Sequence, residues 1–207
     1  MKGIITICRE YGSGGRLIAQ KAADRLGVPF YDKQLIARVA QKGGYAIEYV
    51  EETGEYAAAG SLLFGLTTGG AYYHGLIPGE TISNADKIYI LQSRIIEQIA
   101  QEGPCVIVGR SAGYILRERG DVLNVFVHAD LEHKTGRAVE YFGIAPEDVP
   151  KELKKRDKLR AAHHRHYTDQ QWDKASNYHL AVDSGRFGID GSVAVILEAA
   201  ERAFAGK

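Results

Sequence analysis

The sequence predicts an α/β fold built on a doubly wound parallel sheet. Short, almost wholly apolar runs at residues 4–8, 105–108 and 122–128 alternate with helical patterns along the chain. Such runs are typical of parallel strands that helices cover on both faces. A chain of 207 residues, 45% of them apolar, suits a single domain around one core.

The first quarter of the chain predicts two strands and two helices. The strand at 4–8 ends in a glycine-rich turn, and residues 28–31 form a second, brief extended segment. Between them, apolar residues recur at helical spacing and stop at Gly27. Asp32 stands at the N-cap position of the next helix, whose apolar residues are Leu35, Ile36 and Val39.

Residues 43–85 have a different composition, rich in glycine and with four glutamates between positions 48 and 55. This composition predicts a mobile lobe and not a layer of the core. From residue 86 the strand–helix alternation resumes. The further predicted elements are a helix at 86–102 ended by Gly103 and Pro104, a strand at 105–108, a turn at 109–111, a helix ending near Gly120, a strand at 122–128, a charged helical stretch at 131–174 broken near 143–150, a strand at 179–182, a turn at 183–185 and a helix at 190–204.

Charge and composition exclude several classes of protein. The chain has 26 basic and 26 acidic side chains, whereas proteins that coat nucleic acid are usually far more basic. Two cysteines provide neither a disulfide framework nor metal-ligand spacing. The N-terminus is too short for a signal sequence, and no stretch reaches 18 apolar residues. We therefore expect a cytoplasmic protein with no membrane or nucleic-acid partner; the oligomeric state stays open.

Ligands of doubly wound sheets bind beyond the carboxyl ends of the strands, which directs attention to the turns at 9–16, 31–33, 109–111 and 183–185. The first turn holds Gly12, Ser13, Gly14 and Gly15 and then Arg16. Backbone N–H groups of such a turn, at a helix N-terminus, can bind phosphate. The turn departs from the P-loop pattern G-x-x-x-x-G-K-[ST], because Leu17 stands at the hydroxyl position. A tight turn without any ligand is the alternative.

Three further features have both a functional and an ordinary interpretation. Arg110 follows the strongest strand and can bind a phosphate there, or it can be a surface arginine. Asp32 and Arg38 can meet a ligand, or they can be a helix cap and a solvated side chain. The stretch 151–174 carries eight Lys or Arg, four Asp or Glu and three histidines, His163, His164 and His166. It can be a solvated face or, less in keeping with its composition, a nucleic-acid patch or a metal site.

Taken together, these motifs resemble the cytidylate kinase-like family. The similar segments are residues 5–7, 9–16 and 29–33 at the start, 105–110 in the middle, and Asp157-Lys158-Leu159-Arg160, Tyr167-Thr168, Trp172 and Asn177-Tyr178 near the end. The resemblance covers nearly the whole chain and is weakest at 43–85. It implies a P-loop nucleoside monophosphate kinase fold with a core (1–32, 86–130 and 173–207), a monophosphate-binding lobe (33–85) and a helical lid (131–172).

The resemblance also implies roles for individual residues. Residues 12–16 would bind the ATP phosphates, and the acceptor site would comprise Asp32, Arg38, Arg110 and Asp157. Catalytic roles fall to Arg16, Arg137, Arg156 and Arg160. The aspartate of the family's Gly-Arg-Asp turn is replaced here by Ser111.

The implied reaction is transfer of the ATP γ-phosphoryl group, with Mg²⁺ whose protein ligands stay unidentified, to a nucleoside monophosphate such as CMP or dCMP. Two alternatives are a nucleotide-binding regulatory module without turnover and a small-molecule kinase with another acceptor.

Overall fold

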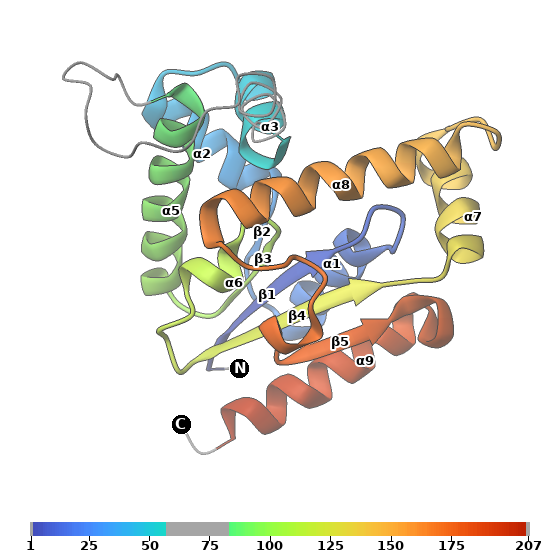
Figure 1. The fold of residues 1–207 in the computed structure, drawn as a ribbon. Helices are drawn as coiled ribbons and strands as arrows, with labels where there is room; N and C mark the ends of the chain where they lie inside the picture. The colour runs from blue at the N-terminus through green and yellow to red at the C-terminus, as the bar shows by residue number, and fades with distance from the viewer. Residues whose placement is uncertain (1, 57–82, 206–207) are drawn as a thin grey trace.

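The computed structural model describes residues 2–56 and 83–205, and a five-stranded sheet lies at its centre (Figure 1). All paired strands are parallel, and the strand order is β2-β3-β1-β4-β5. The strands are β1 (Ile4–Arg9), β2 (Phe30–Tyr31), β3 (Cys105–Val108), β4 (Val122–His128) and β5 (Leu180–Asp183). The predicted doubly wound parallel sheet is therefore confirmed.

Helices connect successive strands and cover both faces of the sheet. They are α1 (Gly15–Leu26), α2 (Lys33–Gly43), α3 (Ile47–Tyr56), α5 (Asn84–Glu102), α6 (Ala112–Ile115), α7 (Leu131–Phe142), α8 (Val149–Thr168), the 3₁₀ helix η1 (Ala175–Asn177) and α9 (Ser184–Phe204). None of the helices in the described part of the chain has the length and apolar character needed to cross a bilayer.

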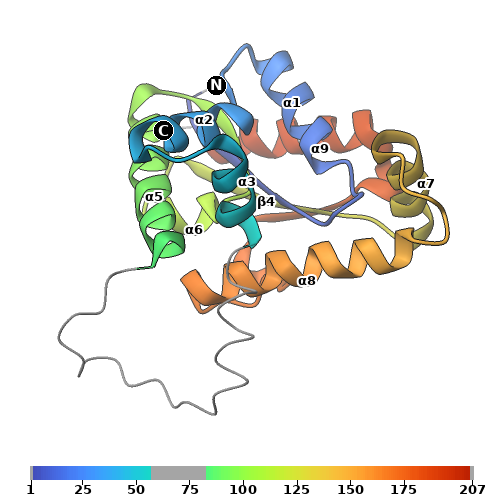
Figure 2. The same ribbon diagram turned by 90° about the horizontal axis from the view of Figure 1, so that it is seen from above.

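The core forms two apolar layers, one on each face of the sheet. On one face, Ile5 and Val125 of the strands pack with Ile18 of α1 and Ile196 of α9. Figure 2 shows α1 and α9 together on that side, with α8 on the other. Burial of each such side chain stabilises the fold by about 1.5–3 kcal/mol.

The opposite layer includes part of the predicted lobe. Leu35 and Val39 of α2 and Val50 of α3 are fully buried in the same cluster as Ile4 and Ile107 of the strands. Residues 33–54 thus pack against the sheet as part of the main core. The remainder of the predicted lobe, residues 57–82, lies outside the described residues.

Helix ends differ from the sequence prediction where a capping side chain was overlooked. Ser83 accepts a hydrogen bond from the Asp86 N–H at 3.1 Å, so α5 begins at residue 84 and not at 86. Asp183 caps α9 in the same way through the Gly185 N–H, at 2.9 Å. The predicted turn at 183–185 is therefore the first turn of a helix, which is kinked at Gly188.

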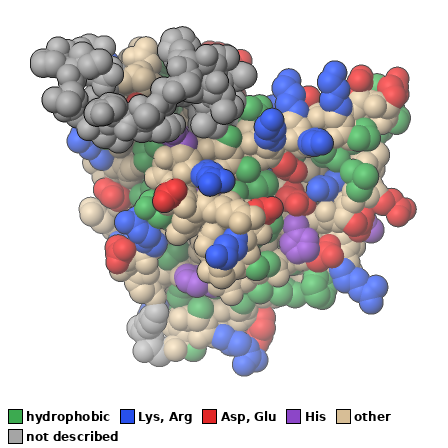
Figure 3. All heavy atoms as spheres, in the orientation of Figure 1, with side chains coloured by type: hydrophobic (Ala, Val, Ile, Leu, Met, Phe, Trp, Pro, Cys, Tyr) green, Lys and Arg blue, Asp and Glu red, His purple; other side chains and the backbone are tan. Residues whose placement is uncertain are grey.

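The charged stretch forms two helices, α7 and α8, and the predicted break between them is confirmed. The helix before β4 is shorter than expected, since α6 ends at Ile115 and not near Gly120. Lys and Arg side chains gather over α8 on the face seen in Figure 3. The exposed ones are Lys151, Lys154, Lys155, Lys158 and Arg165.

Candidate functional site

A cavity of about 300 Å³ lies at the carboxyl ends of β1, β2 and β3. Three of the four turns that the sequence indicated meet there, and α8 forms its outer wall. Its lining comprises Arg9, Glu10, Tyr11, Gly12, Gly14, Gly15 and Arg16 from the first turn, Asp32, Lys33 and Glu51, then Arg110, Phe142, Arg156 and Arg160.

The glycine turn has a conformation that side chains would disturb. Gly12 and Gly14 have φ values of 79° and 75°, in the left-handed region that favours glycine. A Cβ on Gly15 would lie 2.5 Å from the Cβ of Arg9. Within the described residues, the backbone N–H groups of Gly12 and Gly14 donate no hydrogen bond. They are available to an anion at the N-terminus of α1.

Two side chains of α8 fix the shape of this turn. The Asp157 carboxylate accepts the Tyr11 N–H at 2.7 Å, and the Arg160 guanidinium donates to the Arg9 carbonyl at 3.3 Å. Burial raises the pKa of Asp157 to about 6, although the Tyr11 N–H and Arg160 act in the opposite direction. Asp157 does not line the cavity; it holds the loop, whereas the sequence placed it in the acceptor site.

Arg137 is also a loop contact. Its guanidinium donates to the Ser13 carbonyl at 3.0 Å and to the Ser184 carbonyl at 2.8 Å. It is not among the residues that line the cavity. The structure thus places Arg137 outside the cavity lining, where it ties the glycine turn to α9, whereas the resemblance implied a place beside the transferring phosphoryl group.

Arg16 and Asp32 form a pair at the mouth of the cavity. Arg16 Nε donates to Asp32 Oδ2 at 2.5 Å, and 53% of the arginine side chain is exposed. Asp32 precedes α2 but makes no capping hydrogen bond with its side chain. The carboxylate that the sequence assigned to either a cap or a ligand therefore orients the P-loop arginine.

Two arginines of α8 face inward, unlike the exposed cations on the same helix. Arg156 donates to Glu152 at 2.6 Å, and Arg160 is 8% exposed. Both guanidinium groups lie over the Tyr11 ring, 5.4 and 5.5 Å from its centroid. The charge run is thus a solvated face along most of α8 and a cavity wall at these two positions.

Arg110 lies in the same cavity, after β3. It has a φ of 58°, uncommon for a residue other than glycine, and is only 5% exposed. Its Nη1 has no hydrogen-bond partner in the described part of the chain. A buried guanidinium with an unused donor is well suited to bind an oxyanion.

Arg38 does not join Arg110, which corrects the expectation that both reach one acceptor phosphate. It donates to Glu102 at 3.0 Å and lies over the Tyr31 ring, outside the cavity. Glu102 ends α5 just before β3 begins, at the amino ends of the strands. The turn of α2 directs the side chain at position 38 toward α5 and away from the crevice.

Sequence reasoning assigned no role to several residues near the site, and two of them are informative. Lys33 lines the cavity beside Asp32 and had no assigned role. Gln92 is 1% exposed within the apolar stripe of α5, between Ile88 and Ile95. A polar residue in such a stripe is a signal that could have identified it.

The residues present do not fit a magnesium ion held by the protein. The described residues form no group of three or more possible metal ligands. Leu17 replaces the hydroxyl of the P-loop, and the carboxylates of Glu10 and Asp32 are bonded to Lys134 and Arg16. Glu51 is the one other carboxylate among the described residues that line the cavity. Mg²⁺ in kinases usually takes one or two such oxygens besides phosphates and water.

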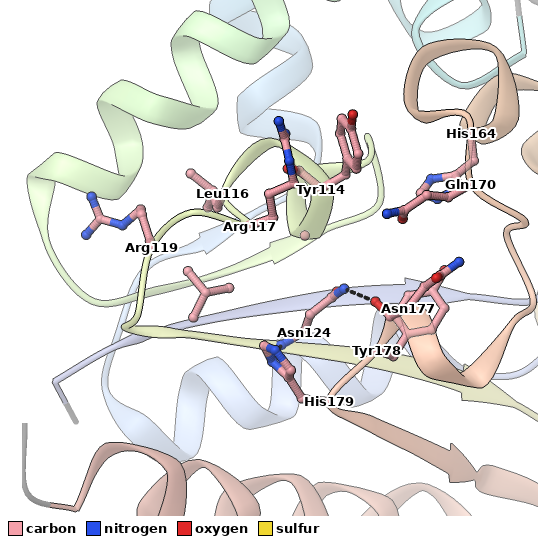
Figure 4. Close-up of a pocket in the computed structure, with 12 residues that line it drawn as sticks. Tyr114, Leu116, Arg117, Arg119, Asn124, His164, Gln170, Asn177, Tyr178 and His179 are labelled. Atoms are coloured by element: carbon pink, nitrogen blue, oxygen red, sulfur yellow. Dashed lines mark hydrogen bonds between the residues drawn. The ribbon is translucent and has the colours of Figure 1, made fainter.

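A second, smaller cavity of about 100 Å³ lies between α6 and residues 170–179 (Figure 4). Asn124 donates from its side chain to the Asn177 carbonyl and from its backbone to His179. His164 Nδ1 lies 3.2 Å from Ser111 Oγ, while its Nε2 has no partner in the described chain. Burial lowers the pKa of His164 to about 4, so the ring is neutral at physiological pH.

Comparison with known proteins gives one family. The model of the cytidylate kinase-like family matches residues 4–186. No protein with a curated description matches the sequence.

Solved structures show the same fold. An uncharacterized protein from Eubacterium ventriosum ATCC 27560 is similar with a TM-score of 0.72 and 25% identity, over 97% of this chain and 99% of that chain. A shikimate kinase from Bacteroides thetaiotaomicron has a TM-score of 0.53 and 14% identity, over 97% and 99% of the two chains. A gluconokinase from Sinorhizobium meliloti 1021 has a TM-score of 0.53 and 18% identity, over 98% and 96%. The sheet and its helices therefore have the P-loop kinase fold.

Proposed function

Because the chain belongs to the cytidylate kinase-like family, we propose that it transfers the γ-phosphoryl group of ATP to CMP or dCMP. The products are ADP and the corresponding nucleoside diphosphate. The observation that carries this proposal is the convergence of Arg16, Arg110, Arg156 and Arg160 on one cavity at the carboxyl edge of the sheet. Phosphoryl transfer depends mainly on positioning and on neutralising charge, which such a cavity can provide.

The donor phosphates bind at the turn of residues 12–16 in this proposal. The free N–H groups of Gly12 and Gly14 donate to phosphate oxygens, and the buried Ser13 holds the turn by donating to the Glu10 carbonyl. Arg16 replaces the missing P-loop lysine once ATP competes with Asp32 for its guanidinium. Asp157 and Arg137 act as positioning residues, since both bond the backbone of the turn.

In this proposal the acceptor phosphate binds at Arg110, which follows β3, the strand next to the one that leads into the glycine turn. Asp32, released from Arg16, can accept from the sugar or base of the monophosphate. Arg38 is left out of this site because it is bonded to Glu102. Arg156 and Arg160 bind the transferring phosphoryl group, where an arginine can contribute roughly 10³–10⁵ in rate.

Residues 131–172 act as a lid in this proposal. Closure of α7 and α8 over the nucleotide excludes water, which would otherwise compete as the acceptor. Mg²⁺ bound to ATP would be held by the phosphate oxygens and water, and it would neutralise part of the phosphate charge. No step is assigned to a protein-bound metal, because the residues present do not form a site for one.

A coupled assay of ADP release with a panel of acceptors tests the proposal. The panel holds CMP, dCMP, UMP, AMP, shikimate and gluconate, since two structures of similar fold are described as a shikimate kinase and a gluconokinase. Turnover that is fastest with CMP or dCMP supports the proposed reaction. Tight ATP binding without turnover would indicate a regulatory module, and turnover with shikimate or gluconate a different small-molecule kinase.

A further inference from the structure

Two buried side chains that both adjoin Gly54 each hold a nitrogen donor without a partner in the described part of the chain. Gln92 Nε2 and Arg110 Nη1 make no hydrogen bond in the described part of the chain, and their residues are 1% and 5% exposed. Buried donors are nearly always satisfied by protein or water, because an unsatisfied one is costly. Two together indicate a place that another molecule completes.

Gly54 of α3 shows that both side chains adjoin one point. A Cβ built on Gly54 would lie 2.8 Å from Arg110 Nη1 and 3.1 Å from Gln92 Oε1. The absence of a side chain at position 54 lets α3 pack directly over both groups. Glu51, one turn earlier on α3, and Arg110 itself line the cavity at the carboxyl ends of the strands, so this point adjoins two residues of that cavity.

The surrounding charge favours an anion there. Among the residues that line the cavity, the cations outnumber the carboxylates; the cations are Arg9, Arg16, Lys33, Arg110, Arg156 and Arg160, and the carboxylates are Glu10, Asp32 and Glu51. A dianionic phosphate therefore fits this wall better than a neutral hydroxyl group does.

We propose that Gln92 is a specificity-determining residue of the acceptor site: it donates from Nε2 to an oxygen of the acceptor's phosphate, beside the oxygen bound by Arg110. The inference rests on the proposed function in taking Arg110 as the acceptor-binding residue. Gly54 lies against Arg110 Nη1 and Gln92 Oε1, so this proposal requires α3 to move away from these two side chains when the acceptor binds. Gln92 thereby distinguishes a phosphate monoester from acceptors that offer only hydroxyl groups at this place.

The test compares Gln92→Leu and Gln92→Glu with Gln98→Leu. Gln98 is an exposed glutamine on the same helix, bonded to Lys42 at 2.8 Å and distant from the cavity lining. Gln92→Leu should raise KM for CMP by at least about tenfold, the effect of one hydrogen bond to a charged group, and leave KM for ATP within about twofold. Gln98→Leu should change neither constant.

Gln92→Glu separates a binding role from a packing role. A carboxylate at position 92 pairs with Arg110 and repels phosphate, so KM for CMP should rise by more than about 100-fold while the unfolding temperature is maintained or raised. A residue needed only for packing would show the opposite, a lower unfolding temperature with an unchanged KM ratio. Either that result or a KM for CMP within about twofold of the parent in both variants would overturn the inference.

Calorimetric titration with CMP and with inorganic phosphate separates this inference from the proposed function. If the parent protein turns over no monophosphate, but Gln92→Leu weakens CMP binding at least tenfold and Gln98→Leu does not, the phosphate site stands and the proposed reaction fails. If the parent turns over CMP and neither variant at position 92 affects its KM, the site assignment fails alone. A parent that binds neither CMP nor phosphate overturns both.

Discussion

The cavity at the carboxyl ends of the strands and the cavity between α6 and residues 170–179 differ in how their polar groups are bonded. At the carboxyl ends of the strands, the N–H groups of Gly12 and Gly14 and the Nη1 of Arg110 have no partner within the described residues. Between α6 and residues 170–179, Asn124 and His179 are bonded to each other and Arg119 is bonded to Asp121 at 2.7 Å. Most polar groups named in the second cavity are thus already hydrogen-bonded within the protein.

The electrostatic difference between the cavities leads to the same conclusion. His164, whose Nε2 is the unpartnered atom of the second cavity, is neutral at physiological pH because burial lowers its pKa to about 4. A neutral imidazole attracts anions weakly, and the two arginines of that cavity, Arg117 and Arg119, are paired with Glu118 and Asp121. The cavity at the strand ends has more fixed positive charge, with Arg110, Arg156 and Arg160 among its lining residues. Unpaired donors and fixed charge at the strand ends, more than the presence of a hollow, therefore distinguish a phosphate site.

The largest effect should come from removing Arg160. Arg160→Ala removes a buried guanidinium that lines the cavity and also supports the Arg9 carbonyl, so kcat/KM should fall by about 10³-fold. Steady-state kinetics with ATP and CMP measure it, and an unfolding curve checks that the variant folds. Lys154→Ala, an exposed cation on the same helix, is the matched control and should change kcat/KM less than twofold. Equal losses in the two variants would mean that the charge of α8 as a whole matters, and not its inward side.

Removal of Arg16 should have the next largest effect. The P-loop lysine is missing and Arg16 is the cation at the end of the glycine turn, so Arg16→Ala should lower kcat by at least about 10²-fold. Lys21→Ala is the control, because Lys21 is on the same helix and bonds Asp190 outside the cavity. Turnover of Arg16→Ala within a factor of about two of the parent would show that the backbone of the turn suffices for the donor phosphates.

How far the sequence predicted this site depended on whether a residue lies in a turn or on a helix. The glycine turn and Arg110 directly follow strands, and parallel strands bring their carboxyl ends to one edge, so their place in the cavity could be inferred from order alone. For residues on helices the outcome varied: Arg156 and Arg160 of α8 line the cavity, whereas Arg38 and Arg137 do not, because direction there depends on how the helix rotates against its neighbours. Tertiary packing decides that rotation, and the alternation of strands and helices does not contain it.

The fold class was more predictable than the residues at which individual helices begin and end. Continuous apolar runs such as that at 105–108 require cover on both faces, and this was enough to predict a parallel sheet. Helix ends were missed where short polar side chains, Ser83 and Asp183, accept N–H groups of the first turn. Val50 could not be assigned to the core, because the glutamates and glycines around it hide a single buried face of α3.

Opposite pH dependences of stability should further separate the support of the glycine turn, which includes Asp157, from the second cavity, which His164 lines. Burial raises the pKa of Asp157 from 3.8 to about 6, so the native state binds more protons than the unfolded state in that window and stability falls as pH rises through it. The pKa of His164 is lowered from 6.5 to about 4, so its contribution to stability rises over a similar window. Each contribution amounts to roughly 2–3 kcal/mol.

Urea unfolding of Asp157→Asn and His164→Gln between pH 4 and pH 7 measures these contributions. Relative to the parent, Asp157→Asn should gain free energy of unfolding as pH rises, because it no longer loses a bound proton. His164→Gln should lose free energy of unfolding relative to the parent over the same range. Differences that slope in the same direction would mean that one of the two groups is solvated in solution.

The smallest effect is expected at Arg38. It tests whether residues at the amino ends of the strands, away from the cavity, contribute to acceptor binding. Arg38 pairs with Glu102 at the amino ends of the strands, on an exposed surface where such a pair contributes little. Arg38→Ala should therefore leave KM for CMP within about twofold of the parent, while Arg110→Ala raises it by at least about tenfold. The resemblance to the cytidylate kinase-like family implies the contrary, an arginine of α2 on the acceptor phosphate.

A tenfold rise in KM for Arg38→Ala would mean that α2 rotates when CMP binds, breaks the Glu102 pair and brings Arg38 to the edge that Arg110 occupies. Glu102→Gln then discriminates further, since releasing Arg38 from its partner should lower KM for CMP if that rotation occurs and leave it unchanged if it does not.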